Sequence, residues 1–425
     1  MKVLHVIPSL SPKDGGPSFA LPLIAKGLAH AGVQVDVAAT VGKGEIPGVT
    51  SRLNDGECAA QVMRDGVNYF YFRRQTEFYK VSFPLARWLS ARILDYDLVH
   101  IHALFSYSSY CAATIATKAG VPYVIRPLGV LNRWGMQNRR RLLKRASFRL
   151  IEKRILRNAA TIHFTSKQEK LEAEETGTIF RSEVIPLGID TAPFVTLSDP
   201  EQFYERFPHT RGRDIILFLS RVDQKKGLDL LLRAFAEIVA QGRPNRDDAR
   251  QPLLVIAGDG DKDFVAKLQR LDRDLNINHV LWVGFLDGAV KLSALAAASI
   301  FVLPSYSENF GIALVEAMAA GLPSVSSDSV AIAEDANECE AGLVVPCEVQ
   351  PLSSAIRRLL DEPELRCRLG SKARRLVEDR FSLAAMTSSI VELYGRILSH
   401  RSPAPSAFKV AAHASPERFN ESVRH

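Results

Sequence analysis

Cysteine is scarce in this sequence of 425 residues, and long apolar runs are missing. The 5 cysteines are an odd and widely scattered set without a Cys-x-x-Cys pair, which favours reduced thiols over a disulfide framework or a thiolate metal site. No apolar run reaches the roughly 18 residues that span a bilayer, which argues against a transmembrane helix. The first apolar run, Val3 to Ile7, is too short for a secretory signal, so we expect the protein to reside in the cytosol.

The G-x-G-x-x-G fingerprint of dinucleotide-binding domains is also absent, which weakens a dehydrogenase interpretation. What is present describes a soluble globular protein, with 47% hydrophobic and 24% charged residues. The length favours two or three domains over a single core.

The net charge of +7 is unevenly distributed. Between Arg139 and Arg157 there are nine basic residues and one acid, Glu152, and apolar residues recur among them at helical spacing. This pattern predicts a basic amphipathic helix, which could bind an anionic membrane, bind another polyanion, or present a solvated face. We favour the membrane surface, which would make the protein peripheral at the inner face of the cell membrane.

Short β-branched runs alternate with helical segments in both halves of the chain, as expected for α/β domains with parallel sheets. The predicted strands are Val3 to Ile7, Gln34 to Ala39, Leu98 to His102, Tyr123 to Arg126, Thr161 to Phe164, Ile215 to Leu219, Leu253 to Ala257, Val280 to Val283, Ile300 to Leu303 and Ser324 to Ser326.

The periodicity lapses after Pro186, so we place the domain boundary there, between residues 1–190 and 191–400. The last predicted helix could pack back onto the N-terminal domain. Residues 401–425 lose apolar periodicity, and we expect them to be disordered.

Two carboxylates flank a predicted junction between a strand and a helix. Glu308 follows the strand Ile300 to Leu303, and Glu316 lies inside the helix that begins near Gly311. A helix start offers unpaired N–H groups to phosphate, and carboxylates accept hydrogen bonds from sugar hydroxyls. The pair suits a nucleotide sugar, although Glu308 could also be an ordinary helix-start charge and Glu316 a solvated residue.

Two other predicted strand ends carry residues suited to anions. Gly15 and Gly16 follow the first strand and allow close approach of backbone to a ligand, although a glycine pair also fits an ordinary turn. Arg221 and Lys226 follow the strand Ile215 to Leu219, where cations oppose the helix dipole, which argues for a bound anion. His102 ends another strand as either a structural group or a catalyst.

Together these motifs resemble the retaining glycosyltransferases of the GT-B fold, a family that includes many bacterial envelope and exopolysaccharide enzymes. The resemblance rests on Gly15-Gly16, His102, Arg221 with Lys226, and Glu308 with Glu316 eight positions later. It covers roughly the first four hundred residues. It implies two Rossmann-like domains that face each other across a cleft, with the acceptor on the N-terminal domain and the nucleotide sugar on the C-terminal one.

The resemblance also implies roles for individual residues. Arg221 and Lys226 would bind the donor diphosphate, and Gly15 and Gly16 would approach it from the opposite wall. The remaining donor contacts would be a sugar hydroxyl at Glu308, backbone N–H groups around Phe310, Gly311 and Ile312, and the ribose at Glu316.

The sequence departs from the family pattern at two places. Many relatives have a histidine before the glycine after the fourth strand, whereas this chain has Arg126-Pro-Leu128-Gly129, so Arg126 could contact phosphate or acceptor instead. Val330-Ala331 replaces the usual glycine pair in the loop after Ser324 to Ser326, although Glu334 is retained.

We therefore predict a retaining glycosyltransferase that moves a sugar from a nucleoside diphosphate donor to a glycan or lipid-linked acceptor. No cofactor, no metal and no nucleic acid is expected. The alternatives are a nucleotide-sugar epimerase of similar fold and a non-catalytic protein that binds a polyanion or membrane surface through the basic helix.

Overall fold

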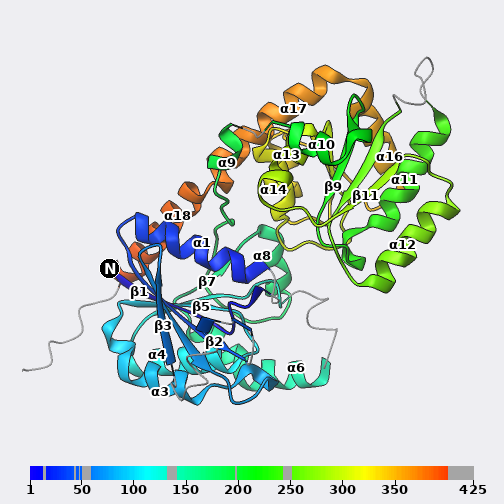
Figure 1. Cartoon of the computed structure of the whole chain (residues 1–425). Helices are drawn as coiled ribbons and strands as arrows, with labels where there is room; N and C mark the ends of the chain where they lie inside the picture. The colour runs from blue at the N-terminus through cyan, green and yellow to red at the C-terminus, as the bar shows by residue number, and fades with distance from the viewer. Residues whose placement is uncertain are drawn as a thin grey trace, which may run out of the picture.

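The computed structural model describes residues 1–12, 16–42, 45–46, 48–49, 59–131, 141–196, 199–242 and 251–400. The predicted tail, 401–425, lies outside the described residues, as does Gly15. The described chain forms two α/β domains, each built on a twisted sheet with helices on both faces (Figure 1).

The N-terminal sheet has the strand order β3-β4-β2-β1-β5-β6-β7-β8. Its strands are β1 (Lys2–Ile7), β2 (Gln34–Val41), β3 (Ala59–Arg64), β4 (Val67–Arg73), β5 (Leu98–His102), β6 (Tyr123–Arg126), β7 (Thr161–Phe164) and β8 (Ser182–Val184). The order reverses between β1 and β5, and at such a switch point the loops that follow the two strands open a crevice for ligands.

Alternate residues of the N-terminal strands enter two separate cores. Val3 and Ile7 of β1 pack toward helices α1 and α18, whereas Leu4 and Val6 pack toward the opposite face. The helices of this domain are α1 (Gly16–His30), α3 (Phe83–Arg92), α4 (Tyr107–Ala119), α6 (Arg141–Ser147), a π-helical turn (Phe148–Glu152), α7 (Lys153–Asn158) and α8 (Lys167–Glu174).

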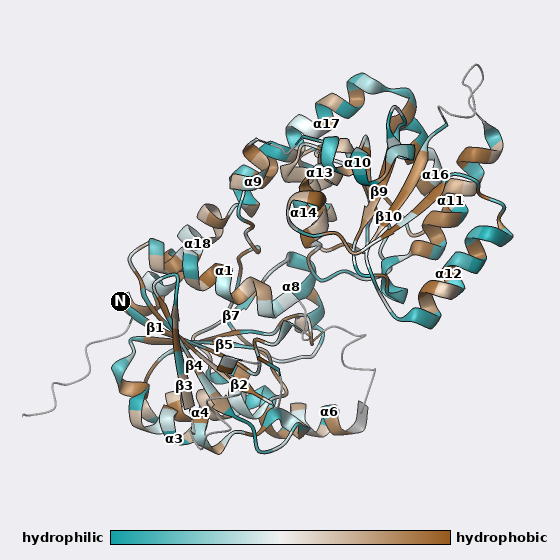
Figure 2. Ribbon diagram, viewed as in Figure 1, coloured by the Kyte–Doolittle hydropathy of each residue, from teal (hydrophilic) through white to brown (hydrophobic). Residues whose placement is uncertain are grey.

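The C-terminal sheet is parallel, with the order β11-β10-β9-β12-β13-β14 and a switch point between β9 and β12. Its strands are β9 (Ile215–Leu219), β10 (Leu253–Ala257), β11 (Val280–Gly284), β12 (Ile300–Leu303), β13 (Ser324–Ser327) and β14 (Leu343–Val345). The central strands are apolar along their whole length because helices cover both faces (Figure 2).

The helices of the C-terminal half surround this sheet and then return to the first domain. They are α9 (Ala192–Val195), α10 (Glu201–Arg206), α11 (Leu228–Gln241), α12 (Lys262–Asp274), α13 (Gly288–Ala297), α14 (Ile312–Ala319), α15 (Ala333–Glu338), α16 (Val349–Asp361), α17 (Pro363–Leu376), a π-helical turn (Val377–Phe381) and α18 (Leu383–Ser399).

The chain crosses between the domains twice, and the two crossings touch. Helix α18 lies along α1 of the N-terminal domain (Figure 1), where Gly27 leaves room for Thr387. The first crossing is hydrogen-bonded to the second, because Ile189 N donates to Phe381 O at 2.9 Å and Leu383 N donates to Ile189 O at 2.8 Å.

The structure differs from the sequence-based expectation at the sheet edges and in the basic segment. Strands β3 and β4 form an antiparallel hairpin, so the N-terminal sheet is mixed rather than purely parallel. The basic helix is interrupted by the π-helical turn, and its first two residues, Arg139 and Arg140, lie outside the described residues. Within the described ranges, no helix has the length and apolar character that crossing a membrane requires.

Candidate functional site

A cavity of about 330 Å³ lies between the two domains at their switch points. The N-terminal domain contributes Gly16, Arg126 and Thr165 to its lining, and the loops after β9 and β12 contribute the facing side. The lining includes most of the predicted site residues, namely Gly16, Arg126, Arg221, Lys226, Glu308, Phe310, Gly311 and Ile312. Parallel strands bring these loops together because their carboxyl ends share one edge of the sheet.

The loop after β9 is held against the loop after β12 by a glycine contact. Gly227 has φ +66°, and a Cβ added there would lie 2.0 Å from Pro304 O, so a larger residue would push the two loops apart. Tyr306 N also donates a hydrogen bond of 2.7 Å to Lys225 O. These contacts fix Lys226 beside the β12 loop.

Lys226 and Glu308 form an ion pair inside the cavity. Their side chains are only 14% and 18% exposed, so the pair is largely withdrawn from water. Arg221 also lines the cavity and is exposed to solvent. An entering phosphate group would therefore meet one accessible guanidinium and one ammonium that already has a carboxylate partner.

The start of α14 completes this wall of the cavity. Gly311 precedes the helix with φ +99°, and Phe310, Ile312 and Ala313 line the cavity beside it. The first N–H groups of a helix have no intrahelical acceptor and carry partial positive charge. Phe310 anchors the turn, because its ring packs edge-on against Phe381 at a centroid distance of 5.8 Å.

Glu316 lies in an adjoining, mainly apolar cavity of about 380 Å³. The two cavities share Ala20, Leu187 and Ile312 in their linings, so they lie next to each other. Lys291 Nζ of α13 donates a hydrogen bond of 2.8 Å to the Glu316 carboxylate. The arrangement offers apolar surface beside one oriented carboxylate, which suits the base and ribose of a nucleoside.

A polar cavity of about 350 Å³ adjoins the other side and shares Glu308 and Asn309 with the first. Ser166 and Glu172 line it from the N-terminal domain, and Asp328 lines it from the C-terminal domain. Such hydroxyl and carboxylate groups can hydrogen-bond to the hydroxyls of a carbohydrate.

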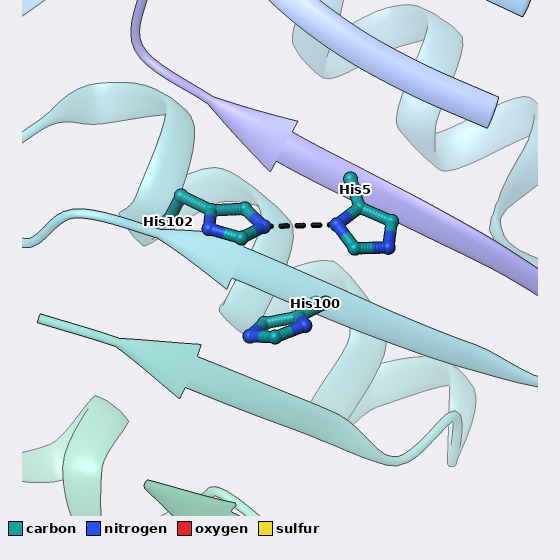
Figure 3. Close-up of side chains that lie close together, drawn as sticks. All are labelled: His5, His100 and His102. Atoms are coloured by element: carbon teal, nitrogen blue, oxygen red, sulfur yellow. Dashed lines mark hydrogen bonds between the residues drawn. The ribbon is translucent and has the colours of Figure 1, made fainter. Parts of the chain in front are cut away.

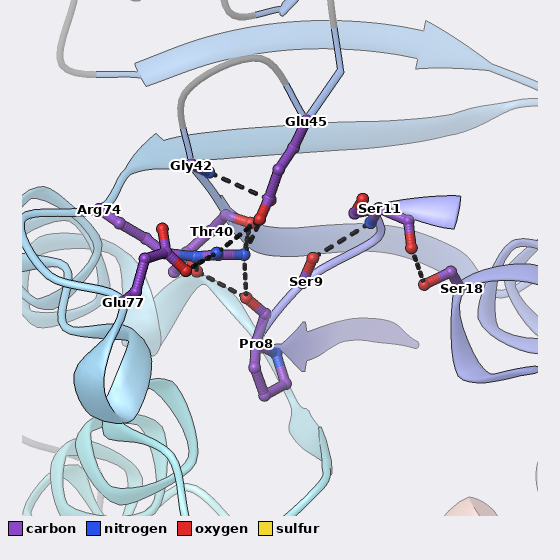
Figure 4. A network of polar contacts seen from close by, with 9 residues as sticks. All are labelled: Pro8, Ser9, Ser11, Ser18, Thr40, Gly42, Glu45, Arg74 and Glu77. Atoms are coloured by element: carbon purple, nitrogen blue, oxygen red, sulfur yellow. Dashed lines mark hydrogen bonds and ion pairs between the residues drawn. The ribbon is translucent and has the colours of Figure 1, made fainter. Parts of the chain in front are cut away.

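The loop between β1 and α1 is folded by polar contacts that involve no predicted site residue. Ser18 Oγ donates a hydrogen bond of 2.7 Å to Ser11 O at the start of α1 (Figure 4). Nearby, the buried Arg74 guanidinium donates hydrogen bonds to Glu45, Glu77 and Thr40 (Figure 4). The Ser18 contact ties the start of α1, which includes Gly16, to Ser11 after β1.

His102, predicted as either a structural group or a catalyst, is fully buried and is not part of the cavity lining. Its Nε2 is 2.9 Å from His5 Nδ1, and its ring stacks on that of His100 (Figure 3). His100 is in turn 2.6 Å from the Tyr394 hydroxyl of α18. Burial lowers the pKa of His102 well below its usual value, so it is a neutral group of the core.

In the same three histidines, one ring nitrogen of each lies within 4.8 Å of the others, a separation that could suit a metal ion. Two of the nitrogens are already hydrogen-bonded to each other, and the positive charge of Arg126 adds to burial in lowering the pKa of His5 and His102. That charge also opposes the entry of a cation. The histidines are therefore better explained as a hydrogen-bonded packing cluster.

Two family models match the chain. Residues 201–376 match "Glycosyl transferases group 1" and residues 15–188 match "Glycosyl transferase 4-like domain". The chain belongs to the group 1 glycosyltransferases. This chain is 32% identical over 213 residues to a phosphatidyl-myo-inositol mannosyltransferase of Mycolicibacterium smegmatis, a match that covers 49% of this chain and 50% of the relative. It is 31% identical over 188 residues to an alpha-D-kanosaminyltransferase of Streptomyces kanamyceticus, covering 44% and 46%.

These matches span about half the length of the curated relatives. Solved structures resemble this chain over nearly its whole length and show its GT-B fold. Anabaena Alr3699/HepE in complex with UDP has a TM-score of 0.73 at 20% identity and covers 93% of this chain and 100% of its own. A sucrose-phosphate synthase from Thermosynechococcus elongatus has a TM-score of 0.69 at 21% identity, covering 94% and 99%.

The departure at Val330-Ala331 supports Glu308 by backbone contacts. Glu308 N donates to Ser329 O at 3.1 Å, and Ala331 N donates to Glu308 O at 3.0 Å. Glu334 forms an exposed ion pair of 3.6 Å with Lys167 of the N-terminal domain.

Sequence reasoning missed Lys291 and Asn309 in the candidate site. Lys291 is 25 positions before its partner Glu316, on a different helix, and no short-range pattern connects them. Asn309 is adjacent to Glu308, and its side chain is the group that a Cβ at Gly129 would meet at 2.1 Å. The glycine at position 129, in the segment Arg126-Pro-Leu128-Gly129 that departs from the family pattern, was the one sequence signal for this close approach.

Proposed function

We propose that this group 1 glycosyltransferase transfers a sugar from a nucleoside diphosphate donor to a hydroxyl of a glycan or lipid-linked acceptor, with retention of configuration and without a metal ion. The observation that carries the proposal is the single cavity into which Arg221, the Lys226–Glu308 pair and the start of α14 converge. Structures of a protein with the same fold in complex with UDP and UDP-glucose support a nucleotide-sugar donor.

The leaving diphosphate gains negative charge as the bond to the anomeric carbon breaks. Arg221, Lys226 and the first N–H groups of α14 are arranged to stabilise this charge without a metal. The acceptor oxygen then attacks on the face that the phosphate leaves, and its proton passes to the phosphate oxygen released by bond cleavage. No enzymic nucleophile is required.

Glu308 has two roles in this proposal. Its carboxylate holds Lys226 in place in the free protein. When the donor phosphate takes over Lys226, a carboxylate oxygen becomes available to accept a hydrogen bond from a sugar hydroxyl. Glu316, oriented by Lys291, would accept from the ribose in the adjoining cavity.

The donor can be identified by thermal denaturation with a panel of nucleoside diphosphates and nucleotide sugars, because a ligand that binds only the folded state raises the melting temperature. Transfer is then tested with candidate acceptors, and the product's anomeric configuration is read by NMR. An inverted product rules out retention, and activity that disappears with EDTA and returns with a divalent metal rules out metal independence.

The same donors and acceptors also distinguish the proposed transferase from two alternative functions. An epimerase would convert the bound donor into its isomer in the absence of acceptor. A non-catalytic binding protein would bind vesicles or a polyanion and leave every donor unchanged.

We also propose that the segment from α6 to α7 contacts an anionic membrane surface on the cytoplasmic side. Leu143 and Leu150 are 49% and 78% exposed, and Arg145 and Arg149 are exposed beside them. Apolar side chains among cations suit a headgroup region that carries negative charge. A lipid-linked acceptor would be presented at that surface.

A further inference from the structure

Arg126 has a different environment from the other cations of the cavity. It ends strand β6, is only 3% exposed and lines the cavity between the domains. Within the described part of the chain, its buried Nε and Nη1 atoms have no hydrogen-bond partner. A buried guanidinium without partners is costly, and native proteins rarely retain one without a reason.

The polar groups near this guanidinium leave its Nε and Nη1 atoms without a hydrogen bond among the described residues. The Glu169 carboxylate attracts Arg126 electrostatically, but its oxygens accept hydrogen bonds from Gly129 N at 2.6 Å, Thr165 N at 2.8 Å and Thr165 Oγ1 at 2.9 Å. The histidine cluster on the other side is neutral; its hydrogen bonds are made within the cluster, with Tyr394 and with Ile185, and His102 Nδ1 is buried without a partner. Arg126 therefore lines the cavity while its Nε and Nη1 donors make no hydrogen bond.

The other cations already provide for the donor diphosphate. Arg221 and Lys226 lie on the C-terminal wall with the start of α14, whereas Arg126 lies on the N-terminal wall. A planar guanidinium with free donors is suited to a carboxylate or phosphate, which it can bind with two parallel hydrogen bonds. A neutral hydroxyl would leave the buried charge uncompensated.

We propose that Arg126 recognises a second anionic group of the substrates, a carboxylate or phosphate in addition to the donor diphosphate. The group belongs either to the transferred sugar, as in a hexuronate, or to the acceptor next to it. This inference rests on the proposed function and specifies its substrate class as anionic.

The first test needs no ligand. Arg126→Met replaces the guanidinium with an apolar side chain of similar length, so the melting temperature of the free protein should rise by roughly 2 °C, because an unpaired buried charge is removed. Arg126→Lys keeps the charge and should bring no such rise. A fall of several degrees for Arg126→Met would mean that the guanidinium is paired within the protein, and would overturn the proposal.

The second test uses the nucleoside diphosphate that binds best to the unchanged protein. Arg126→Met should bind this diphosphate within about twofold of the wild type, while Arg221→Ala should bind it at least tenfold more weakly. A wild-type protein that binds no nucleoside diphosphate defeats the proposed function itself. Equal loss in both variants assigns Arg126 to the diphosphate and defeats only the present inference.

The anion is then located with matched pairs of compounds. In the first arm, the nucleotide hexuronate is compared with the corresponding nucleotide hexose. In the second, a hexose phosphate is compared with the free hexose as acceptor fragment, in the presence of the diphosphate. In one arm the wild type should favour the anionic compound by at least tenfold, and Arg126→Met should abolish that preference. Wild-type protein without a preference in either arm, or a preference that survives in Arg126→Met, would overturn the proposal.

Discussion

Among the described residues, three cations line the interdomain cavity, and they differ in what compensates their charge. Arg221 is exposed to water, Lys226 is paired with Glu308, and Arg126 is buried with unpaired donors. Burial lowers the pKa of Arg126 to about 10, which still leaves the side chain charged at neutral pH. Each cation therefore contributes to ligand binding at a different desolvation cost.

Removal of a cation from the phosphate wall should reduce turnover. For Arg221→Ala or Lys226→Met we expect a loss of roughly a hundredfold, because one charged contact to the leaving diphosphate contributes on the order of 3 kcal/mol. Steady-state kinetics with the identified donor checks this. Lys262→Ala on α12 removes an exposed charge outside the cavity lining and should leave turnover unchanged. Full activity in both cavity variants would contradict the assignment.

Much of the cavity could be predicted from single positions because its residues follow strands with clear apolar patterns. Arg221, Lys226 and Glu308 lie after β9 and β12, which adjoin at the switch point of the sheet. The environment of His102 could not be predicted, since it depends on Tyr394 of a helix almost three hundred positions away, which packs against the neighbouring His100.

At the scale of elements, the inner strands other than β4 and the edge strand β11 were predictable, whereas the edge strands β3, β8 and β14 were not. Strands β8 and β14 each have three residues of intermediate exposure, too few for a recognisable period. The β3–β4 hairpin nevertheless has a turn signal in its sequence. Asp65 and Gly66 have φ of +52° and +75° between two alternating runs, the chemistry of a tight two-residue hairpin turn.

The contact between the two interdomain crossings leaves no room for a side chain at Gly188. A Cβ there would lie 2.5 Å from Ser382 O and 2.8 Å from Leu383 Cα, both rigid backbone atoms. Gly188→Ala should therefore destabilise the protein by about 1 to 3 kcal/mol, measured by thermal denaturation. Gly395→Ala in α18 meets no atom within 4 Å and should be neutral or slightly stabilising. Equal melting temperatures for the two variants would refute this packing argument.

The buried histidines of strands β1, β5 and β7 should make stability depend on pH. Burial and the charge of Arg126 lower the pKa of His5 and His163 to about 3. Between about pH 6.5 and pH 3 these histidines bind protons in the unfolded chain but not in the folded protein. Their contribution to the free energy of unfolding is therefore fully present above about pH 6.5 and is lost as the pH falls.

Each such histidine adds up to about 1.4 kcal/mol per pH unit to this loss. His163→Gln should make the decline between pH 7 and pH 5 shallower, as measured by urea denaturation. His30→Gln, at an exposed position of α1, should leave the slope unchanged. An unaltered slope in His163→Gln would show that this histidine is accessible to protons in the folded state.

At the scale of the whole molecule, the proposed membrane contact can be measured by sedimentation with vesicles. The protein should bind vesicles that contain phosphatidylserine and not vesicles of phosphatidylcholine alone, and binding should weaken with salt. Leu150→Ser with Arg149→Ser should reduce binding several-fold. The matched pair Leu171→Ser with Lys170→Ser in α8 changes a comparable exposed position and should not. Equal binding to neutral vesicles would contradict an electrostatic surface contact.

Helix α18 closes the first domain with the last described residues of the chain. Tyr394 is fully buried against His100, and Gly27 of α1 accommodates Thr387. During synthesis, residues 1–190 leave the ribosome before α18 has been translated. Until then, the face of α1 that packs against α18 is uncovered. The domain that is translated first is therefore the one that completes its folding last.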